Sequence, residues 1–287
     1  MLGRLDRNPK GNAMHELRRA TLNGDAFEYF DVGDGRPILF LHGALGDLRT
    51  WQGHSAALSD RYRCIAYTQR YFGRISWRDD GAPFGVATHA EDLIAFAEAL
   101  GLAPVYLVAW SYSGHIAFQV ALRRPDLFRR VMVYEPGVPS FVTDPEALAA
   151  FGRDAQILYG SIAGAVNNGD LEEAARLMID GSGEDGYLGR QSPEYRSIIR
   201  DNLQSLPRLM AQTPPPKITC EDLATLKMPV SIVHGSLTRP AFAIPSRAAA
   251  RCIRHARHVE VPGAGHLWPQ ENPRDFSAVV EELDRTM

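Results

Sequence analysis

The sequence predicts an α/β protein: a mostly parallel, twisted sheet of eight strands, with helices on both faces and a helical cap inserted after the sixth strand. Two observations predict this class. Short apolar runs alternate with stretches of helical periodicity over most of the 287 residues, which favours a parallel sheet. One long region carries helical periodicity only. We therefore expect a loose N-terminal extension (1–15), a core (16–140 and 226–287) and a helical cap (141–225).

Eight segments predict strands. The first two flank the turn Asn23-Gly24-Asp25, which is typical of a β-hairpin, so the sheet should begin antiparallel. The third, Pro37–Leu41, is a continuous apolar run, which is typical of a strand buried on both faces. In chain order the predicted strands are 16–22, 26–32, 37–41, 63–67, 105–110, 130–134, 228–234 and 259–261.

Helices are predicted between these strands and in the cap. Residues 86–100 have apolar positions at helical spacing and stop at Gly101. The last helix, 272–286, begins with Asn272 as its cap and Pro273 in its first turn. A helix also follows Gly114, and the cap has helical patterning over 145–158, 170–179 and 193–209. A helical insertion between two strands is well placed to cover the strand ends.

Composition bounds the function. With 45% hydrophobic and 23% charged residues the chain is typical of a soluble globular protein. A net charge of −3 implies no strong attraction to nucleic acid or to an anionic membrane. No segment has the length of a transmembrane helix or the apolar core of a signal peptide. Residues 1–13 are polar, and Met14 is an alternative start.

The cysteines and acidic residues suggest neither a disulfide nor a metal. Cys64, Cys220 and Cys252 are scattered and odd in number, so we expect no disulfide framework and a reducing, cytoplasmic location. Asp79 and Asp80 lie in a Gly/Pro loop without the spacing of metal ligands. We expect no cofactor and no metal.

Ser111 is the strongest candidate for chemistry. It lies where the apolar run ending at Trp110 gives way to a helical pattern, and the small residues Ala109 and Ser113 stand two before and two after it. A strained strand–turn–helix with a nucleophile at its apex needs small flanking residues, because the strand and helix backbones approach closely there. The alternative is a buried serine in an ordinary strand–helix turn.

Two more candidates follow strand ends. Glu135 follows the strand that comes after the Ser111 turn, which we call the elbow (109–113). His266 follows the last strand, in the run Gly263-Ala-Gly-His. Ligands of open α/β sheets bind beyond the carboxyl ends of the strands. Because a serine hydroxyl is a weak nucleophile, it needs a base, and the base needs a group that holds its tautomer. The sequence therefore predicts Ser111 as nucleophile and His266 as base.

From residue 16 onward the chain resembles the α/β-hydrolase family in its strand order and loop positions. The resemblance rests on four loops: Leu41-His42-Gly43-Ala44, the elbow 109–113, the histidine loop 263–266, and 68–76, which matches the family's D-x-R-G-x-G-x-S. It implies the α/β-hydrolase fold and an oxyanion hole formed by the backbone N–H groups of Ala44 and Tyr112. The fourth loop departs from the family, since Thr68 replaces its Asp and Tyr71 its first Gly.

The position of the acidic residue that orients the histidine also departs from the family pattern. In most members it follows the strand that here ends at Gly235, but Thr238 stands at that place. Certain haloalkane dehalogenases of the family carry the acid after the strand that follows the elbow, where this chain has Glu135. The resemblance therefore predicts a Ser111–His266–Glu135 triad, with Thr238 as a neutral, hydrogen-bonding remnant.

Glu135 has two alternative roles. A Glu-Pro pair can simply end a strand, or the carboxylate can pair with an arginine such as Arg70. In either case a Ser111–His266 dyad would remain, and turnover would be slow.

The resemblance implies a serine hydrolase that cleaves a small to medium apolar ester, lactone or thioester through an acyl-enzyme. Carbon–carbon bond hydrolysis is open on the same apparatus, whereas halide displacement is disfavoured because those relatives use a carboxylate at the elbow. A different class, a ligand receptor or a cofactor-free scaffold for lyase or oxygen chemistry, stays open because of Thr238. The only partner expected is the small-molecule substrate, and the candidate pocket residues are His42, Tyr71, Phe72, Trp110 and Trp268.

Overall fold

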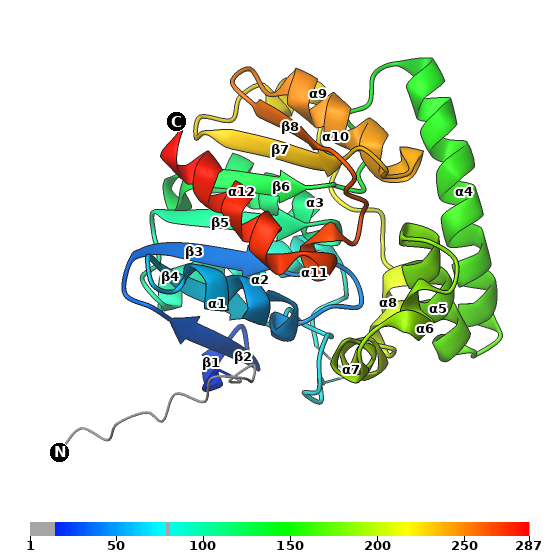
Figure 1. Ribbon diagram of the computed structural model, residues 1–287, viewed down its shortest axis with the longest axis horizontal. Helices are drawn as coiled ribbons and strands as arrows, with labels where there is room; N and C mark the ends of the chain where they lie inside the picture. The colour runs from blue at the N-terminus through cyan, green and yellow to red at the C-terminus, as the bar shows by residue number, and fades with distance from the viewer. Residues whose placement is uncertain (1–14, 79–80, 287) are drawn as a thin grey trace.

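The computed structural model describes residues 15–78 and 81–286, and these have the predicted α/β fold (Figure 1). Their strands form one sheet in the order β1-β2-β4-β3-β5-β6-β7-β8. The pairs β1/β2 and β2/β4 are antiparallel, and the remaining pairs are parallel. The strands are β1 Arg18–Leu22, β2 Asp25–Val32, β3 Arg36–Leu41, β4 Tyr62–Tyr67, β5 Val105–Trp110, β6 Phe128–Tyr134, β7 Val230–Gly235 and β8 Arg257–Val261.

Helices cover both faces of the sheet and one end of it. The core helices are α1 Gln52–Leu58, α2 Val86–Ala99, α3 Tyr112–Arg123, α9 Cys220–Leu223, α10 Pro240–Cys252, α11 Trp268–Glu271 and α12 Pro273–Arg285. Between β6 and β7 the chain forms α4 Pro145–Asn167, α5 Leu171–Ser182, α6 Tyr187–Arg190, α7 Pro193–Asp201 and α8 Ser205–Met210. Two short 3₁₀ turns complete the set, η1 Leu48–Trp51 and η2 Pro125–Leu127.

The central strand β5 shows how the two faces are built. All six of its residues are buried, as a strand covered on both sides requires. Because side chains alternate along a strand, Val105, Leu107 and Ala109 pack with α2, α3 and α10. Tyr106 and Trp110 point the other way and pack with α1 and α12. The elbow that follows β5 is therefore held between two packed cores.

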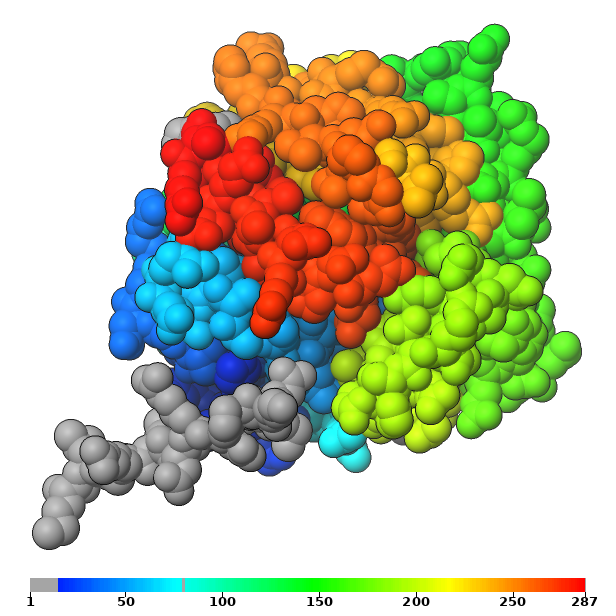
Figure 2. Space-filling view, viewed as in Figure 1, coloured from blue at the N-terminus to red at the C-terminus, as the bar shows by residue number. Residues whose placement is uncertain are grey.

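The helices α4–α8, which we call the cap, lie beside the ends toward which the parallel strand arrows point (Figure 1). Figure 2 shows them packed against the core. Two groups of contacts attach the cap. The guanidinium of Arg239 binds the carboxylate of Asp154 in α4, with N···O distances of 2.8 and 2.9 Å. Asn202, after α7, donates to Asp47 at 3.0 Å and accepts from the backbone N–H of Gly73 at 2.6 Å.

The ends of the predicted parts need correction. Phe141 and α9, which we assigned to the cap, pack in the core against α3 and α10, because the side chains of Phe141 and Leu223 are apolar and buried there. Residues 1–14 of the predicted extension lie outside the described residues. His15 is not loose, since its ring contacts Phe30 with centroids 4.8 Å apart and its Nε2 lies 2.5 Å from Ser55 Oγ.

The expectation of no disulfide is also wrong. Cys220, at the start of α9, is bonded to Cys252, at the end of α10, with an S–S distance of 1.97 Å. The two residues are 32 apart in sequence, so no spacing pattern revealed the pair; the fold brings α9 onto α10. The cysteines therefore give no support to the inference of a reducing compartment.

Two further expectations concern the membrane and metals. In the described part of the chain no helix has the length and hydrophobicity to cross a membrane. Asp79 and Asp80 lie outside the described residues.

Candidate active site

Ser111 stands at the apex of a sharp turn between β5 and α3. Its backbone has φ 57° and ψ −117°, a conformation that L residues rarely adopt. The turn is held from both sides: Ser111 N–H donates to Tyr134 O of β6 at 2.9 Å, and Ser111 O accepts from Gly114 N–H at 2.8 Å. The structure thus has the strand–turn–helix geometry expected of a nucleophile elbow.

Small neighbours make this turn possible. A Cβ on Gly114 would lie 2.8 Å from Val133 Cγ1, and one on Gly43 would lie 3.2 Å from Ser111 Cβ. Ser113, at a position where the family commonly has glycine, fits because its buried hydroxyl donates to His42 O at 2.5 Å. A hydroxyl in place of a hydrogen is tolerated here because it finds an acceptor.

His266 faces the serine. Its Nε2 lies 3.0 Å from Ser111 Oγ, and its Nδ1 lies 2.7 Å from Glu135 Oε2. Because a carboxylate only accepts hydrogen bonds, Nδ1 carries the proton and Nε2 presents its lone pair to the hydroxyl. The histidine loop is fixed from two sides: Trp110 Nε1–H donates to His266 O at 3.1 Å, and Tyr134 O–H donates to Gly265 O at 2.6 Å.

Glu135 is fully buried directly after β6, also at positive φ (51°). Besides His266, it accepts from the backbone N–H of Gly235 at 2.8 Å and from the hydroxyl of Thr238 at 2.7 Å. The alternative that Glu135 pairs with Arg70 is wrong, since the guanidinium of Arg70 binds Asp92 at 2.7 Å and also Asp25. Two donors, Gly235 N–H and the Thr238 hydroxyl, thus hold the carboxylate against the histidine.

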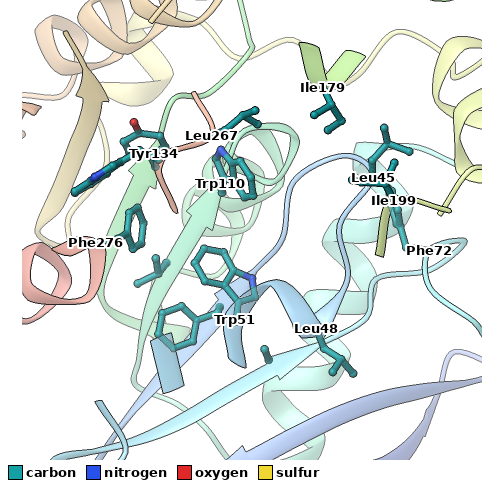
Figure 3. Packing of buried hydrophobic residues seen from close by; sticks show 14 of the residues in the cluster. Leu45, Leu48, Trp51, Phe72, Trp110, Tyr134, Ile179, Ile199, Leu267 and Phe276 are labelled. Carbon is teal, nitrogen blue, oxygen red and sulfur yellow. The ribbon is translucent and has the colours of Figure 1, made fainter. Parts of the chain in front are cut away.

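A cavity of about 300 Å³ opens onto Ser111 and His266. The core contributes Leu45, Trp110 and Leu267, and the cap contributes Ile179 and Ile199 (Figure 3). Phe242, from α10, also lines it and stacks on His266 with ring centroids 3.6 Å apart and planes within 6°. The cavity is therefore an apolar chamber between the strand ends and the cap.

The predicted oxyanion donors border this cavity. Ala44 and Tyr112 line it beside Ser111. Tyr112 is the first residue of α3, so its N–H has no acceptor within the helix. The next residue after Ala44, Leu45, has φ 58°, so the chain turns sharply at the loop that carries Ala44.

Of the predicted pocket residues, Trp110 lines the cavity, whereas His42, Tyr71, Phe72 and Trp268 do not. His42 is fully buried behind the elbow, where its Nδ1–H donates to Gly43 O at 2.9 Å and its Nε2 accepts from Gln69 N–H at 3.0 Å. Burial lowers the pKa of His42 to about 4, so it is neutral at pH 7. It braces two loops and does not line the cavity.

The three aromatic residues pack elsewhere for similar reasons. Tyr71 donates its hydroxyl to Ala82 O and takes φ 69° at the position of the family's glycine. Phe72 packs against the rings of Phe84 and His42. Trp268 packs against the rings of Tyr134 and Phe276, at centroid distances of 5.8 and 5.3 Å.

Sequence reasoning missed Phe242 because it did not predict α10. Pro240 carried the signal, since proline is common in the first turn of a helix. The cap residues of the cavity were missed because helical periodicity does not say which face of a cap helix meets the core.

The comparison with known families decides the wider identity. The model of the alpha/beta hydrolase family matches residues 38–279, most of the chain. This chain belongs to the alpha/beta hydrolase family. Among curated members of the family, haloalkane dehalogenase 2 of Mycobacterium tuberculosis is 28% identical over 265 residues, covering 88% of this chain and 90% of the relative. A haloalkane dehalogenase of Bradyrhizobium diazoefficiens is 34% identical over 122 residues, only 42% of this chain and 39% of that protein.

Solved alpha/beta hydrolase structures agree on the fold. A thermophilic esterase from Thermogutta terrifontis superposes with a TM-score of 0.72 at 23% identity, covering 94% of this chain and 98% of the other. The enol-lactonase from Burkholderia xenovorans LB400 gives 0.71 at 19% identity, covering 93% and 99%. Membership of this family indicates that the chain is a hydrolase.

Proposed function

We propose that this alpha/beta hydrolase is a serine hydrolase that cleaves a small to medium apolar ester, lactone or thioester. The observation that carries the proposal is the pair of hydrogen bonds from Ser111 Oγ to His266, 3.0 Å long, and from His266 to Glu135, 2.7 Å long. Ser111 and His266 border an apolar cavity. Nucleophile, base and orienting acid in this order are the parts that acyl transfer needs.

The reaction follows from these positions. Ser111 Oγ attacks the acyl carbon while its proton passes to His266 Nε2, and Glu135 stabilises the imidazolium that forms. The N–H groups of Ala44 and Tyr112 stabilise the oxyanion, a contribution typically worth about 3–4 kcal/mol for one donor. His266 then protonates the leaving group, and water activated by the same histidine hydrolyses the acyl-enzyme.

Halide displacement does not suit this site, although the curated relatives named above are dehalogenases. Attack of a serine oxygen on a haloalkane carbon would give an alkyl ether. An ether has no carbonyl carbon to which water can add, so the enzyme would not be regenerated. Ser111 therefore favours acyl substrates over haloalkanes.

The receptor alternative arose because no acid stands at Thr238. Glu135 removes that reason, since it makes the contact with His266 Nδ1 that an acid at 238 would make. A fluorophosphonate probe tests the proposal, because such probes phosphonylate only an activated serine. We expect one adduct by intact-protein mass, absent in Ser111→Ala, together with hydrolysis of 4-nitrophenyl butanoate that the same substitution abolishes. An unreacted parent protein, or an adduct that persists in Ser111→Ala, would contradict the proposal.

A further inference from the structure

The cavity wall, as the described residues form it, carries no full charge. Among the described residues that line it there is no Asp, Glu, Lys or Arg. A carboxylate or ammonium group of a ligand would lose its hydration inside this chamber without an ionic partner, which is costly. The cavity therefore suits a neutral molecule.

One polar group stands out on the inner wall. His115 lines the cavity and lies on α3, four residues after Ser111, so it is about one helical turn from the nucleophile. Its Nε2 lies 2.9 Å from the backbone carbonyl of Pro216. A carbonyl can only accept, so Nε2 carries the ring proton. Nδ1 is then a bare acceptor, and no donor from the described residues reaches it.

The charge state of His115 supports this assignment. Burial lowers its pKa to about 4, so the ring is neutral at physiological pH. Two more acceptors lack partners: the side-chain carbonyl oxygens of Gln212 and Gln270 are buried without a donor from the described residues, and both side chains line the same cavity. Buried acceptors without donors are unfavourable unless a ligand or water supplies the hydrogen.

We propose that the cavity selects neutral acyl compounds that carry an O–H or N–H close to the scissile carbonyl, and that His115 is the specificity-determining residue that accepts from this donor. This inference rests on the proposed function of Ser111. It narrows the substrate class from apolar acyl compounds in general to those with a hydrogen-bond donor within a few bonds of the reacting carbon.

Binding tests the proposal apart from turnover. In Ser111→Ala protein, isothermal calorimetry compares phenyl pentanoate with its 2-hydroxy, 3-hydroxy and 2-acetamido derivatives. We expect at least one derivative to bind about three- to tenfold more tightly than the plain ester, the range that one net hydrogen bond supplies. The same derivative should lose this advantage in Ser111→Ala/His115→Leu and in Ser111→Ala/His115→Phe, the second of which keeps an aromatic ring.

A neighbouring residue provides the control. Gln119 donates to the same Pro216 carbonyl at 3.3 Å but does not line the cavity, so Gln119→Ala disturbs the attachment of His115 without removing its Nδ1. The preference should survive in Ser111→Ala/Gln119→Ala. Equal binding of all four esters, no measurable binding of any, or a preference that persists without His115 would overturn the inference. Continued hydrolysis by the Ser111→Ala protein would instead overturn the proposed function.

Discussion

Thr238 donates a 2.7 Å hydrogen bond to Glu135 Oε2, the same oxygen that accepts from His266 Nδ1. The two residues come from neighbouring strand ends, Glu135 after β6 and Thr238 after β7. The place where the family commonly has its acid is thus occupied by a neutral donor, which binds the carboxylate that follows the neighbouring strand β6. This arrangement makes the role of each residue separable by mutation.

Replacing Glu135 with glutamine should lower kcat for a simple ester by about 10³- to 10⁴-fold, because the amide neither fixes the productive tautomer of His266 nor stabilises the imidazolium. Steady-state kinetics with 4-nitrophenyl butanoate measure the loss. Thr238→Val removes only one supporting hydrogen bond, so its loss should be within about tenfold. If both variants lost activity equally, Glu135 would not be the orienting acid.

An aspartate at the family position should partly restore the damaged enzyme. Thr238→Asp in the Glu135→Gln background puts a carboxylate after β7, beside the oxygen that now contacts His266. We expect kcat to recover at least tenfold relative to Glu135→Gln alone. The single variant Thr238→Asp should be impaired, since a second carboxylate would then face that of Glu135 at short distance. A double variant no faster than Glu135→Gln would argue against any access from residue 238 to the histidine.

Gly235 has no room for a side chain. A Cβ there would lie 2.1 Å from the backbone oxygen of Ala264, in the loop that carries His266. Gly235→Ala should therefore destabilise the fold by about 1–3 kcal/mol or more and displace the histidine. Urea unfolding and ester kinetics measure the two effects. Gly265→Ala is the matched control, because a Cβ at that position would have no atom of the described residues within 4 Å; comparable damage from both would contradict this explanation.

Much of the fold could be predicted because the spacing of apolar residues indicates helices and strands, and turn residues such as Gly, Pro and Asn indicate where they end. The buried run Pro37–Leu41 and the hairpin at Asn23-Gly24 lie where the sequence puts them. The elbow could be predicted because its tight turn requires small residues on both sides of the nucleophile, and Ala109 and Ser113 are small. Contacts between residues far apart in the sequence were harder to predict. The distance from Glu135 to His266 depends on the order of strands, and only the resemblance to the family indicated it.

The three wrong predictions of aromatic pocket residues share a cause. Tyr71, Phe72 and Trp268 are aromatic residues next to site motifs, and their nearness in sequence suggested a place in the pocket. Packing decided otherwise, because each found an aromatic cluster behind the site. Part of the real cavity wall comes from the cap, and the orientation of the cap on the core depends on pairs such as Arg239 and Asp154 that no local pattern reveals.

Stability should fall as the solution is acidified below pH 6.5. Burial lowers the pKa of His42 and His115 to about 4 and that of His54 and His89 to about 3, against an ordinary value of 6.5. Between these values the unfolded chain binds more protons than the folded one, so protonation favours unfolding, and the full stability returns above pH 6.5.

Urea unfolding from pH 7 to pH 4.5 checks this dependence. His54 is packed among Phe40, Trp51 and Phe276, so His54→Leu provides the comparison. That variant should show a slope shallower by up to about 1.4 kcal/mol per pH unit. An unchanged slope would mean that His54 does not contribute.

The Cys220–Cys252 disulfide should stabilise the folded protein by about 2–4 kcal/mol, because it restricts the unfolded chain over 32 residues. Urea unfolding with and without reductant measures the difference, and Cys220→Ser should match the reduced protein. Thiol titration counts the free cysteines. Cys64 is buried, and burial raises its pKa to about 12, so the native protein should show no reactive thiol. The denatured protein should show one thiol without reductant and three with it; three in both cases would exclude the disulfide.

The loop after β7 has a second contact besides that of Thr238 with Glu135. Directly after Thr238, Arg239 reaches out of the core and binds both carboxylate oxygens of Asp154 in α4, and the backbone N–H of Ala241 adds a third bond to the same carboxylate at 2.8 Å. The helices over the site are thus not an interchangeable module. A chimera that takes its cap helices from a relative must have a carboxylate at the position of Asp154. Otherwise the guanidinium of Arg239 has no carboxylate partner where the cap meets the core.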